Sequence, residues 1–137
     1  MRLTQQSVNQ LAFDVVGCAI EVHKHLGPGL LESVYELCML EELSRRHLSY
    51  NSQVQVPVQY KGRELGGALR LDIVVEETVI VELKAVETII PLYKAQLLSY
   101  LKLTGMPKGL LINFHAENIT KSLVPLVTDA FSSLPLS

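Results

Sequence analysis

Apolar residues recur every three or four positions in three stretches of the chain, which is the spacing of an amphipathic helix. This pattern predicts helices near residues 4–26, 30–47 and 91–104. Thr4 suits the N-cap of the first helix, and Gly27-Pro28-Gly29 ends it. In the second helix, the residues expected to face the core are Leu31, Val34, Tyr35 and Cys38.

Alternating polar and apolar residues predict β-strands in the middle of the chain. The strands are expected at residues 53–60, in a segment that ends at 75, at 78–84, at 108–114 and, more weakly, at 119–124. Lys61-Gly62 indicates a tight turn, and Gly66-Gly67 indicates a bulge or sharp bend early in the second strand. Pro57 cannot donate a ladder hydrogen bond, so the first strand is expected at a sheet edge.

The order of these elements is α, α, β, β, β, α, β, with an optional final strand. The first three strands are expected to form an antiparallel meander, and the helix between the third and fourth makes that pair parallel. The prediction is therefore one α/β domain, 1–137, with a mixed sheet of four or five strands flanked by helices. Residues 4–128 are its expected ordered core, and 129–137 are expected to fray.

The composition is that of an ordinary globular protein, with 48% hydrophobic and 19% charged residues. No apolar run of eighteen residues and no export signal is visible, so a cytoplasmic location without membrane contact is expected. The net charge of −2 argues against a general duplex-binding protein with a basic face. Yet no acid lies between residues 88 and 116, where Lys94, Lys102 and Lys108 form either the flank of a phosphate site or a solvated face.

Three charged residues, Asp72, Glu82 and Lys84, interrupt the apolar segment from residue 70 to residue 84. If the turn between its two strands has three residues, Asp72 lies directly opposite Glu82, and Glu82 shares a face with Lys84. Opposed side chains in a sheet are about 5 Å apart at Cβ, where two carboxylates repel each other. A bound cation relieves this repulsion, so the pattern favours a divalent metal site beside Lys84.

This set of residues suits metal-assisted hydrolysis of a phosphodiester. Carboxylates are ligands that Mg²⁺ and Mn²⁺ prefer, and such a metal lowers the pKa of a bound water. The main-chain carbonyl of Leu83 is a natural further ligand, and Lys84 can orient the water or stabilise developing charge. The alternative is a surface ion pair, because acids and a lysine near strand ends often form nothing more.

Two other features allow both a structural and a functional interpretation. Gln96 and Tyr100 lie on one face of the third helix, where they either contact substrate and metal waters or are an exposed and a core residue. Glu32 lies in the first turn of the second helix, where the helix dipole already favours an acid. Its position alone favours this simpler interpretation.

Several stretches of the chain, in order, resemble the GxxExxY protein family, which is placed in the PD-(D/E)XK nuclease-like superfamily. The signature is Gly29-Leu-Leu-Glu32-Ser-Val-Tyr35, and the resemblance extends from about Val8 to Val127. The other similar stretches are Gly27-Pro28-Gly29, Lys61-Gly62, Val81-Glu82-Leu83-Lys84-Ala85, Ala95-Gln96-Leu97-Leu98-Ser99-Tyr100 and Gly109-Leu-Leu-Ile-Asn-Phe114.

The resemblance implies a restriction-endonuclease-like αβββαβ core with an extra N-terminal helix. It implies that Asp72 and Glu82 are metal carboxylates and that Lys84 is the lysine of the E-x-K element. It also implies that Glu32 is an acid contributed by the first helix of the core, which reverses the interpretation from its position alone. Leu71 stands where the motif has proline, at a position that varies across the superfamily.

The same resemblance assigns a second group of residues to substrate contact or support. Gln96 and Tyr100 resemble a Q-x-x-x-Y motif of the recombination and exonuclease branch, where it supports the site and its DNA. Tyr35 closes the family signature and is assigned to the same role.

The expected function is therefore that of a Mg²⁺- or Mn²⁺-dependent nuclease, with DNA as the expected partner and a homodimer left open. The carboxyl groups of Glu32, Asp72 and Glu82 are expected to converge beside the Lys84 amine, with the Leu83 carbonyl as a further metal ligand. One alternative is a non-catalytic nucleic-acid-binding or assembly module that retains the fold and the metal site. Another is a protein-interaction domain whose stability does not depend on magnesium.

Overall fold

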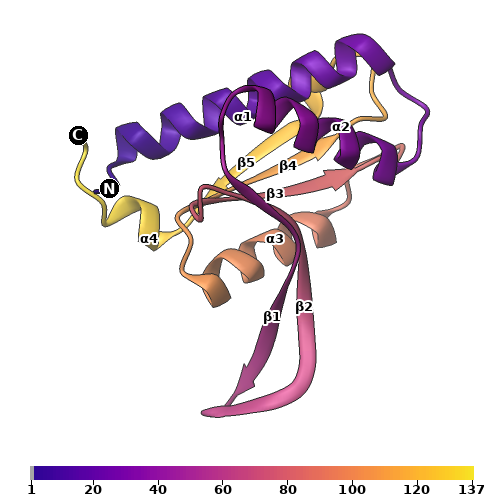
Figure 1. The fold of residues 1–137 in the computed structure, drawn as a ribbon. Helices are drawn as coiled ribbons and strands as arrows, with labels where there is room; N and C mark the ends of the chain where they lie inside the picture. The colour runs from indigo at the N-terminus through magenta and orange to yellow at the C-terminus, as the bar shows by residue number, and fades with distance from the viewer. Residues whose placement is uncertain (1) are drawn as a thin grey trace.

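The computed structural model describes residues 2–137 (Figure 1). Its elements, in chain order, are α1 (Gln5–Leu26), α2 (Glu32–Arg45), β1 (Tyr50–Tyr60), β2 (Arg63–Val75), β3 (Val79–Lys84), α3 (Pro91–Thr104), β4 (Lys108–Asn113), the 3₁₀ helix η1 (Ile119–Ser122), β5 (Leu123–Val127) and α4 (Asp129–Ser132).

Five strands form one mixed sheet in the order β1-β2-β3-β4-β5. The first three are antiparallel neighbours, β3 and β4 are parallel, and β5 is antiparallel to β4. The chain crosses between the two parallel strands through α3, because parallel neighbours need a crossover connection. The predicted restriction-endonuclease-like arrangement, a mixed sheet flanked by helices with an extra N-terminal helix, is confirmed.

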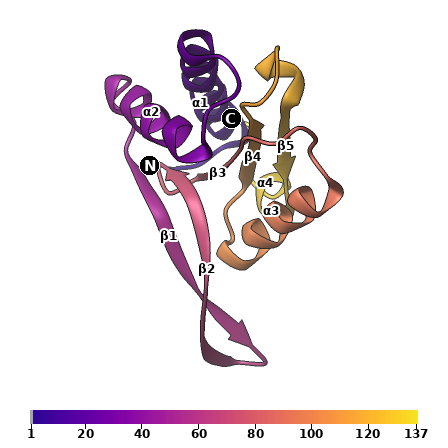
Figure 2. The same ribbon diagram turned by 90° about the vertical axis from the view of Figure 1, so that its right-hand side faces the viewer.

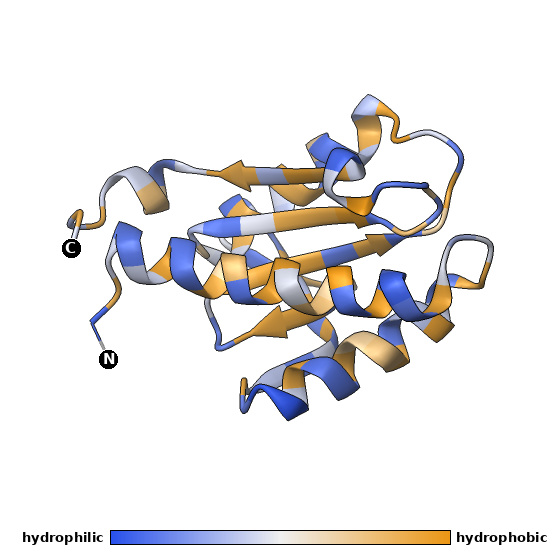
Figure 3. Ribbon diagram, turned by 90° about the horizontal axis from the view of Figure 1, so that it is seen from above, coloured by the Kyte–Doolittle hydropathy of each residue, from blue (hydrophilic) through white to orange (hydrophobic). Residues whose placement is uncertain are grey.

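Helices cover both faces of the sheet, with α1 and α2 on one face and α3 on the other (Figures 1 and 2). Alternation along β3 divides the core between them: Val81 and Leu83 pack in the cluster under α1 and α2, whereas Ile80 packs in the cluster under α3. Figure 3 shows the mainly hydrophobic strands between helices whose hydrophobic and hydrophilic residues alternate. By this alternation, Glu82 and Lys84 share a face, as predicted, and that face is the one under α3.

The helix ends follow the local sequence closely. The Thr4 Oγ1 accepts a hydrogen bond from the Ser7 N–H (3.0 Å), and the Ser7 Oγ accepts one from the Thr4 N–H (2.9 Å). This is the reciprocal capping box that ties off the first turn. Gly105 ends α3 in the left-handed conformation that glycine adopts without strain (φ 74°). The expectation for Leu31 was wrong: it precedes the first turn of α2 in extended conformation and is 73% exposed.

The hairpin of β1 and β2 contains the predicted irregularity. Pro57 pairs with Ala68, but its neighbour Val58 pairs with Leu65, so two residues of β2, Gly66 and Gly67, have no partner in β1. An insertion of this kind bends a strand and increases its twist. β1 is also the edge strand that Pro57 predicts.

The end of the chain differs from the prediction in two places. The 119–124 segment is not a strand throughout, because the Asn118 side chain accepts the Thr120 N–H (3.1 Å) and starts the 3₁₀ turn η1, so that β5 begins only at residue 123. The tail does not fray. Its Pro135 and Leu136 carbonyls accept the N–H groups of Gln5 and Gln6 (2.8 and 3.1 Å), which have no partner within α1.

Among residues 2–137, no helix combines the length and the apolar character that crossing a membrane requires.

Candidate active site

The centre of the site is the point where β2 and β3 stop pairing through their main chains. The ladder runs in the predicted register, with a three-residue turn, as far as Ile73 and Val81. The next pair is Asp72 and Glu82, which are only 9% and 6% exposed. The Asp72 N–H donates to the Glu82 Oε1 (3.2 Å), and the Leu83 N–H donates to the Asp72 Oδ2 (2.9 Å). The two carboxyl groups therefore join the strands and are held together by them.

The closeness of the two acids changes their chemistry. Burial, and then the charge of Asp72, raises the pKa of Glu82 from its ordinary value of 4.5 to about 8. The Lys84 ammonium lowers it, but by less. Near neutral pH the pair therefore carries a proton unless another cation takes its place. This is the observation that fits a divalent metal, because the carboxylate oxygens already lie together and a cation would replace the shared proton.

Lys84 is half-buried on the same face as Glu82. Its Nζ lies over the Tyr93 ring of α3, 4.6 Å from the ring centroid, which is within the range of a cation–π contact. No spacing rule indicated Tyr93 in the sequence. The only signal available was its position in the first turn of a helix that follows β3.

The first two turns of α2 carry two acids on which the charge of Asp72 acts. Glu32 is exposed, yet its pKa is raised, first by partial desolvation and then by the Asp72 charge, while Lys84 and Arg70 oppose the rise. Glu36 lies one turn further on, and burial likewise raises its pKa, although the Gln53 Nε2 donates to its Oε1 (2.7 Å). Sequence reasoning missed Glu36, although the four-residue spacing from Glu32 places both acids on one helix face.

The three predicted acids do not form a metal-binding triad in the described part of the chain. No group of three or more His, Cys, Asp or Glu side chains within residues 2–137 is placed so that it could hold a metal ion. The structure brings Asp72 and Glu82 together, whereas Glu32 is linked to this pair through the charge of Asp72, which raises the pKa of Glu32. The convergence of Glu32 with this pair stays a prediction.

For Tyr100 the sequence left two interpretations open, a core residue or a contact to substrate and metal waters, and the structure has features of both. It packs in the core cluster under α3, and its pKa is raised by burial and then by the charges of Glu82 and Asp72. It is therefore a core residue whose hydroxyl is influenced by the carboxylate pair. Gln96, one turn earlier on α3, is exposed.

Tyr35 supports the loop that leads to Glu32. Its side chain is fully buried, and its ring stacks on Phe114 with 4.5 Å between centroids. Its hydroxyl donates to the Gly27 carbonyl (2.6 Å) and accepts from the Leu30 N–H (3.1 Å). Tyr35 therefore fixes the chain between α1 and α2, which determines where α2 begins.

The acid-free stretch from residue 88 to residue 116 does not form one basic surface. Lys94 and Lys102 are exposed on α3. Lys108 instead donates to the Asn9 Oδ1 on α1 (2.9 Å), and its Nζ lies 5.9 Å from the Phe131 ring centroid. Of the three lysines, only the two on α3 belong to the layer that covers the carboxylate pair.

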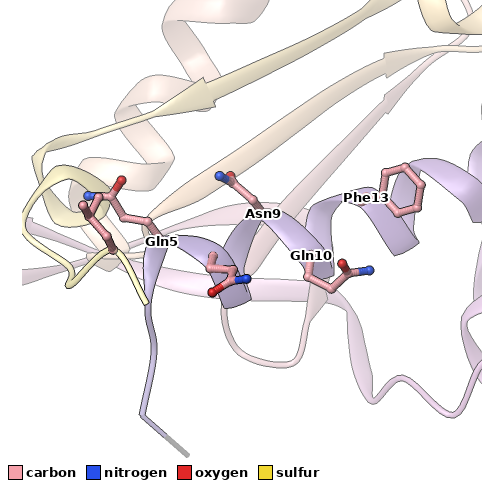
Figure 4. A pocket seen from close by; sticks show the side chains of 6 residues that line it. Gln5, Asn9, Gln10 and Phe13 are labelled. Carbon is pink, nitrogen blue, oxygen red and sulfur yellow. The ribbon is translucent and has the colours of Figure 1, made fainter.

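A shallow hollow beside the N-terminal half of α1 is lined by Gln5, Gln6, Asn9, Gln10, Phe13 and Leu136 (Figure 4). It holds neither an acid nor a nucleophile. The helix that forms it covers the opposite face of the sheet from Glu82 and Lys84. We therefore place the candidate active site at the carboxylate pair.

Comparison with known families gives one match. A family model described as "PD-(D/E)XK nuclease superfamily" matches residues 9–124, which include every candidate residue discussed above. Comparisons with curated proteins and with solved structures gave no match.

Proposed function

Because the chain belongs to the PD-(D/E)XK nuclease superfamily, we propose that it is a metal-dependent nuclease that hydrolyses phosphodiester bonds in DNA. The observation that carries the proposal is the buried pair of Asp72 and Glu82, held beside Lys84 by main-chain hydrogen bonds. Two buried carboxyl groups without a cation cost stability, because two like charges lie close together away from water. Such a cost is typical of a site that is retained for its chemistry.

In this proposal, Asp72, Glu82 and the Leu83 carbonyl hold the metal, and Glu32 is the third acid. When bound, Mg²⁺ or Mn²⁺ would lower the pKa of a water and neutralise charge on the phosphate in the transition state. Asp72 and Glu82 are suited to this task because their hydrogen bonds to the Leu83 and Asp72 N–H groups fix both carboxyl groups before any ligand arrives.

Lys84 supplies a positive charge next to the pair. Its ammonium group has three donors, which can bind a phosphate oxygen or an attacking water. The Tyr93 ring limits where that ammonium can lie. Tyr100 packs in the core cluster under α3, close enough for the charges of Glu82 and Asp72 to raise its pKa, and in this proposal it helps to keep bulk water from the site.

The test compares the wild-type protein with Asp72→Asn on single-stranded, duplex and branched DNA in Mn²⁺ and in Mg²⁺. Asparagine keeps an acceptor for the Leu83 N–H, so the variant should fold, which circular dichroism checks. We expect cleavage by the wild type and a loss of at least about 10²-fold in the variant, because one metal carboxylate is gone. Absence of cleavage on every substrate, or equal rates for both proteins, would refute the proposal.

A second candidate function is favoured because no group of three acids within residues 2–137 is placed so that it could hold a metal ion. A module that binds nucleic acid without cutting it needs the metal only for structure, and two acids can suffice for that. Under this alternative, Mg²⁺ raises the melting temperature of both wild type and Glu32→Gln, and neither protein cleaves DNA. Under the nuclease proposal, Glu32→Gln also weakens Mg²⁺ binding and slows cleavage.

A further inference from the structure

The hairpin of β1 and β2 extends well beyond the rest of the sheet, as Figures 1 and 2 show. We call residues 54–70 the arm. Every residue from 59 to 68 is exposed, and only the base of the arm packs against the α3 cluster, through Val54, Val56 and Leu69. A two-stranded ribbon is at best marginally stable in water, so an arm of this length indicates a partner outside the chain.

The cross-strand pairs give the arm two different faces. The apolar face consists of the pairs Val54–Leu71, Val56–Leu69 and Val58–Leu65. The other face consists of the pairs Gln55–Arg70, Pro57–Ala68 and Gln59–Glu64. Strict alternation does not continue into the site, because Leu71 packs in the α3 cluster and Ile73 packs in the cluster under α1 and α2. Arg70 is nevertheless only two residues before Asp72 on β2, and its charge acts on Tyr100 beside the carboxylate pair.

The arm is basic although the whole chain is acidic. It carries Lys61, Arg63 and Arg70 against one acid, Glu64, while the net charge of the protein is −2. None of these three cations forms an ion pair within residues 2–137, where the two ion pairs present involve Glu21 and Glu41. Arg70 also opposes the rise in the pKa of Glu32 and Glu36, which places its charge at the edge of the site.

Gly66 and Gly67 leave open space beside the arm. Neither glycine has a positive φ. A Cβ at Gly66 would meet nothing within 4 Å, and one at Gly67 would meet only Val58 at 3.7 Å. Neither the conformation nor the packing of the free protein therefore requires glycine at these positions. Glycine in a strand often marks a place where a ligand or another backbone comes near.

We propose that the arm lies in a groove of duplex DNA and binds its phosphates through Lys61, Arg63 and Arg70, so that the duplex is held over the Asp72–Glu82 pair. The seven residues of the arm from Val54 to Tyr60 span roughly 23 Å at about 3.3 Å per residue. That length is about two-thirds of one turn of B-DNA, whose major groove admits a two-stranded ribbon. This inference rests on the proposed nuclease function.

Duplex DNA fits the arm better than a single strand does. Proteins that bind single strands stack bases on several aromatic side chains. The arm has one aromatic residue, Tyr60, and the Lys61 ammonium already lies 5.5 Å from the centroid of its ring. The Gln55–Arg70 pair instead places an amide opposite a guanidinium, a combination that suits phosphates and base edges.

The test removes two positive charges from the tip of the arm, far from the carboxylate pair. Lys61 has φ 50°, which asparagine tolerates, so the variant is Lys61→Asn with Arg63→Gln. The matched control is Lys24→Gln with Lys121→Gln, which removes two exposed charges elsewhere. Binding of a fluorescent 30-base-pair duplex is measured by anisotropy in Ca²⁺, with a single strand of the same sequence for comparison.

We expect the arm variant to bind the duplex roughly fivefold to thirtyfold more weakly than the wild type. We also expect its slope of log K against log salt to fall by about 1.8, since two phosphate contacts are lost. The control should keep the affinity and the slope of the wild type. Equal losses in both variants, or a loss confined to the single strand, would overturn the inference.

The outcomes separate this inference from the proposed function. If the wild type cleaves DNA and the arm variant still binds the duplex like the wild type, the inference fails and the nuclease proposal stands. If the wild type does not cleave DNA but binds the duplex through the arm, the nuclease proposal fails and the inference about the arm stands. Sedimentation velocity covers a third outcome: an arm variant that loses self-association but keeps DNA affinity would assign the arm to a second copy of the chain and overturn the inference.

Discussion

At the scale of single residues, the least favourable electrostatic interaction of the site is the repulsion between two buried carboxyl groups. Asp72 and Glu82 are both buried, and each accepts a main-chain N–H at the point where the β2–β3 ladder ends. A surface ion pair, the alternative interpretation of these residues, would be exposed and would include Lys84. Instead, the Lys84 ammonium lies over the Tyr93 ring, and the two acids are buried side by side.

The first residue-scale prediction concerns the pH dependence of stability without metal. The pKa of Glu82 is about 8 in the folded chain against an ordinary 4.5, so between these values the folded state binds more protons than the unfolded state. The free energy of unfolding should therefore fall as pH rises from 5 to 8, by up to about 1.4 kcal/mol per pH unit. Urea unfolding in EDTA measures it. Glu82→Gln should flatten the curve; an equal slope in both proteins would contradict the prediction.

The second residue-scale prediction tests whether Tyr93 positions Lys84. Tyr93→Phe keeps the aromatic face over which the ammonium lies, whereas Tyr93→Leu removes it. We expect Tyr93→Leu to lower kcat of DNA cleavage about tenfold with little change in KM, and Tyr93→Phe to retain most activity. A merely structural role would instead show equal kcat in the two variants after matching for folded protein. Steady-state kinetics with urea unfolding of each variant decides between these outcomes.

At the scale of elements, the site depends on where α2 begins. Tyr35 ties the Gly27 carbonyl and the Leu30 N–H together beneath the loop, and the first residue of α2 is Glu32. Tyr35→Phe keeps the stack on Phe114 but removes the hydrogen-bond partner of the partly buried Gly27 carbonyl and Leu30 N–H. We expect a loss of about 1–3 kcal/mol in the free energy of unfolding, measured in urea. Weaker Mg²⁺ binding in the folded variant would link the loop to Glu32, while unchanged stability would show that water replaces the hydroxyl.

Most of the element order followed from local signals in the sequence. Turn and cap residues such as Thr4, Lys61-Gly62 and Gly105 determine their own backbone, so their elements were predicted within a few residues. The β2–β3 register was also predicted from the sequence, because a three-residue turn between the strands allows Asp72 only one opposite residue, Glu82. The prediction that Leu31 faces the core was wrong, because apolar periodicity does not show where the first helical turn begins.

The remaining features of the site depend on contacts that no local pattern encodes. The approach of Tyr93 to Lys84 requires α3 to cross back over β3, and the charge of Arg70 reaches α2 only because the hairpin twists beside it. The docking of the tail likewise depends on residues 5 and 135 meeting across the whole chain. Each is a long-range contact whose partner lies in another element.

At the scale of the whole molecule, the two helical layers have separate tasks. α1 and α2 cover the larger core cluster, and the first two turns of α2 supply Glu32 and Glu36 at the edge of the site. α3 covers the face that contains Glu82 and Lys84. The C-terminal tail touches neither Asp72 nor Lys84 but caps α1 from outside, so its contribution to stability should be separable from the chemistry.

The whole-molecule prediction follows from that separation. Deleting residues 134–137 removes the carbonyl groups that accept the Gln5 and Gln6 N–H groups and the Gln5 side-chain amide (3.1 Å to the Leu134 carbonyl). We expect the free energy of unfolding to fall by about 1–3 kcal/mol, because the start of α1 loses its partners. Deleting Ser137 alone is the control and should change little. DNA cleavage per folded molecule should be the same in both truncated proteins; a selective loss of activity in the longer deletion would show that α1 and the site are coupled through the sheet.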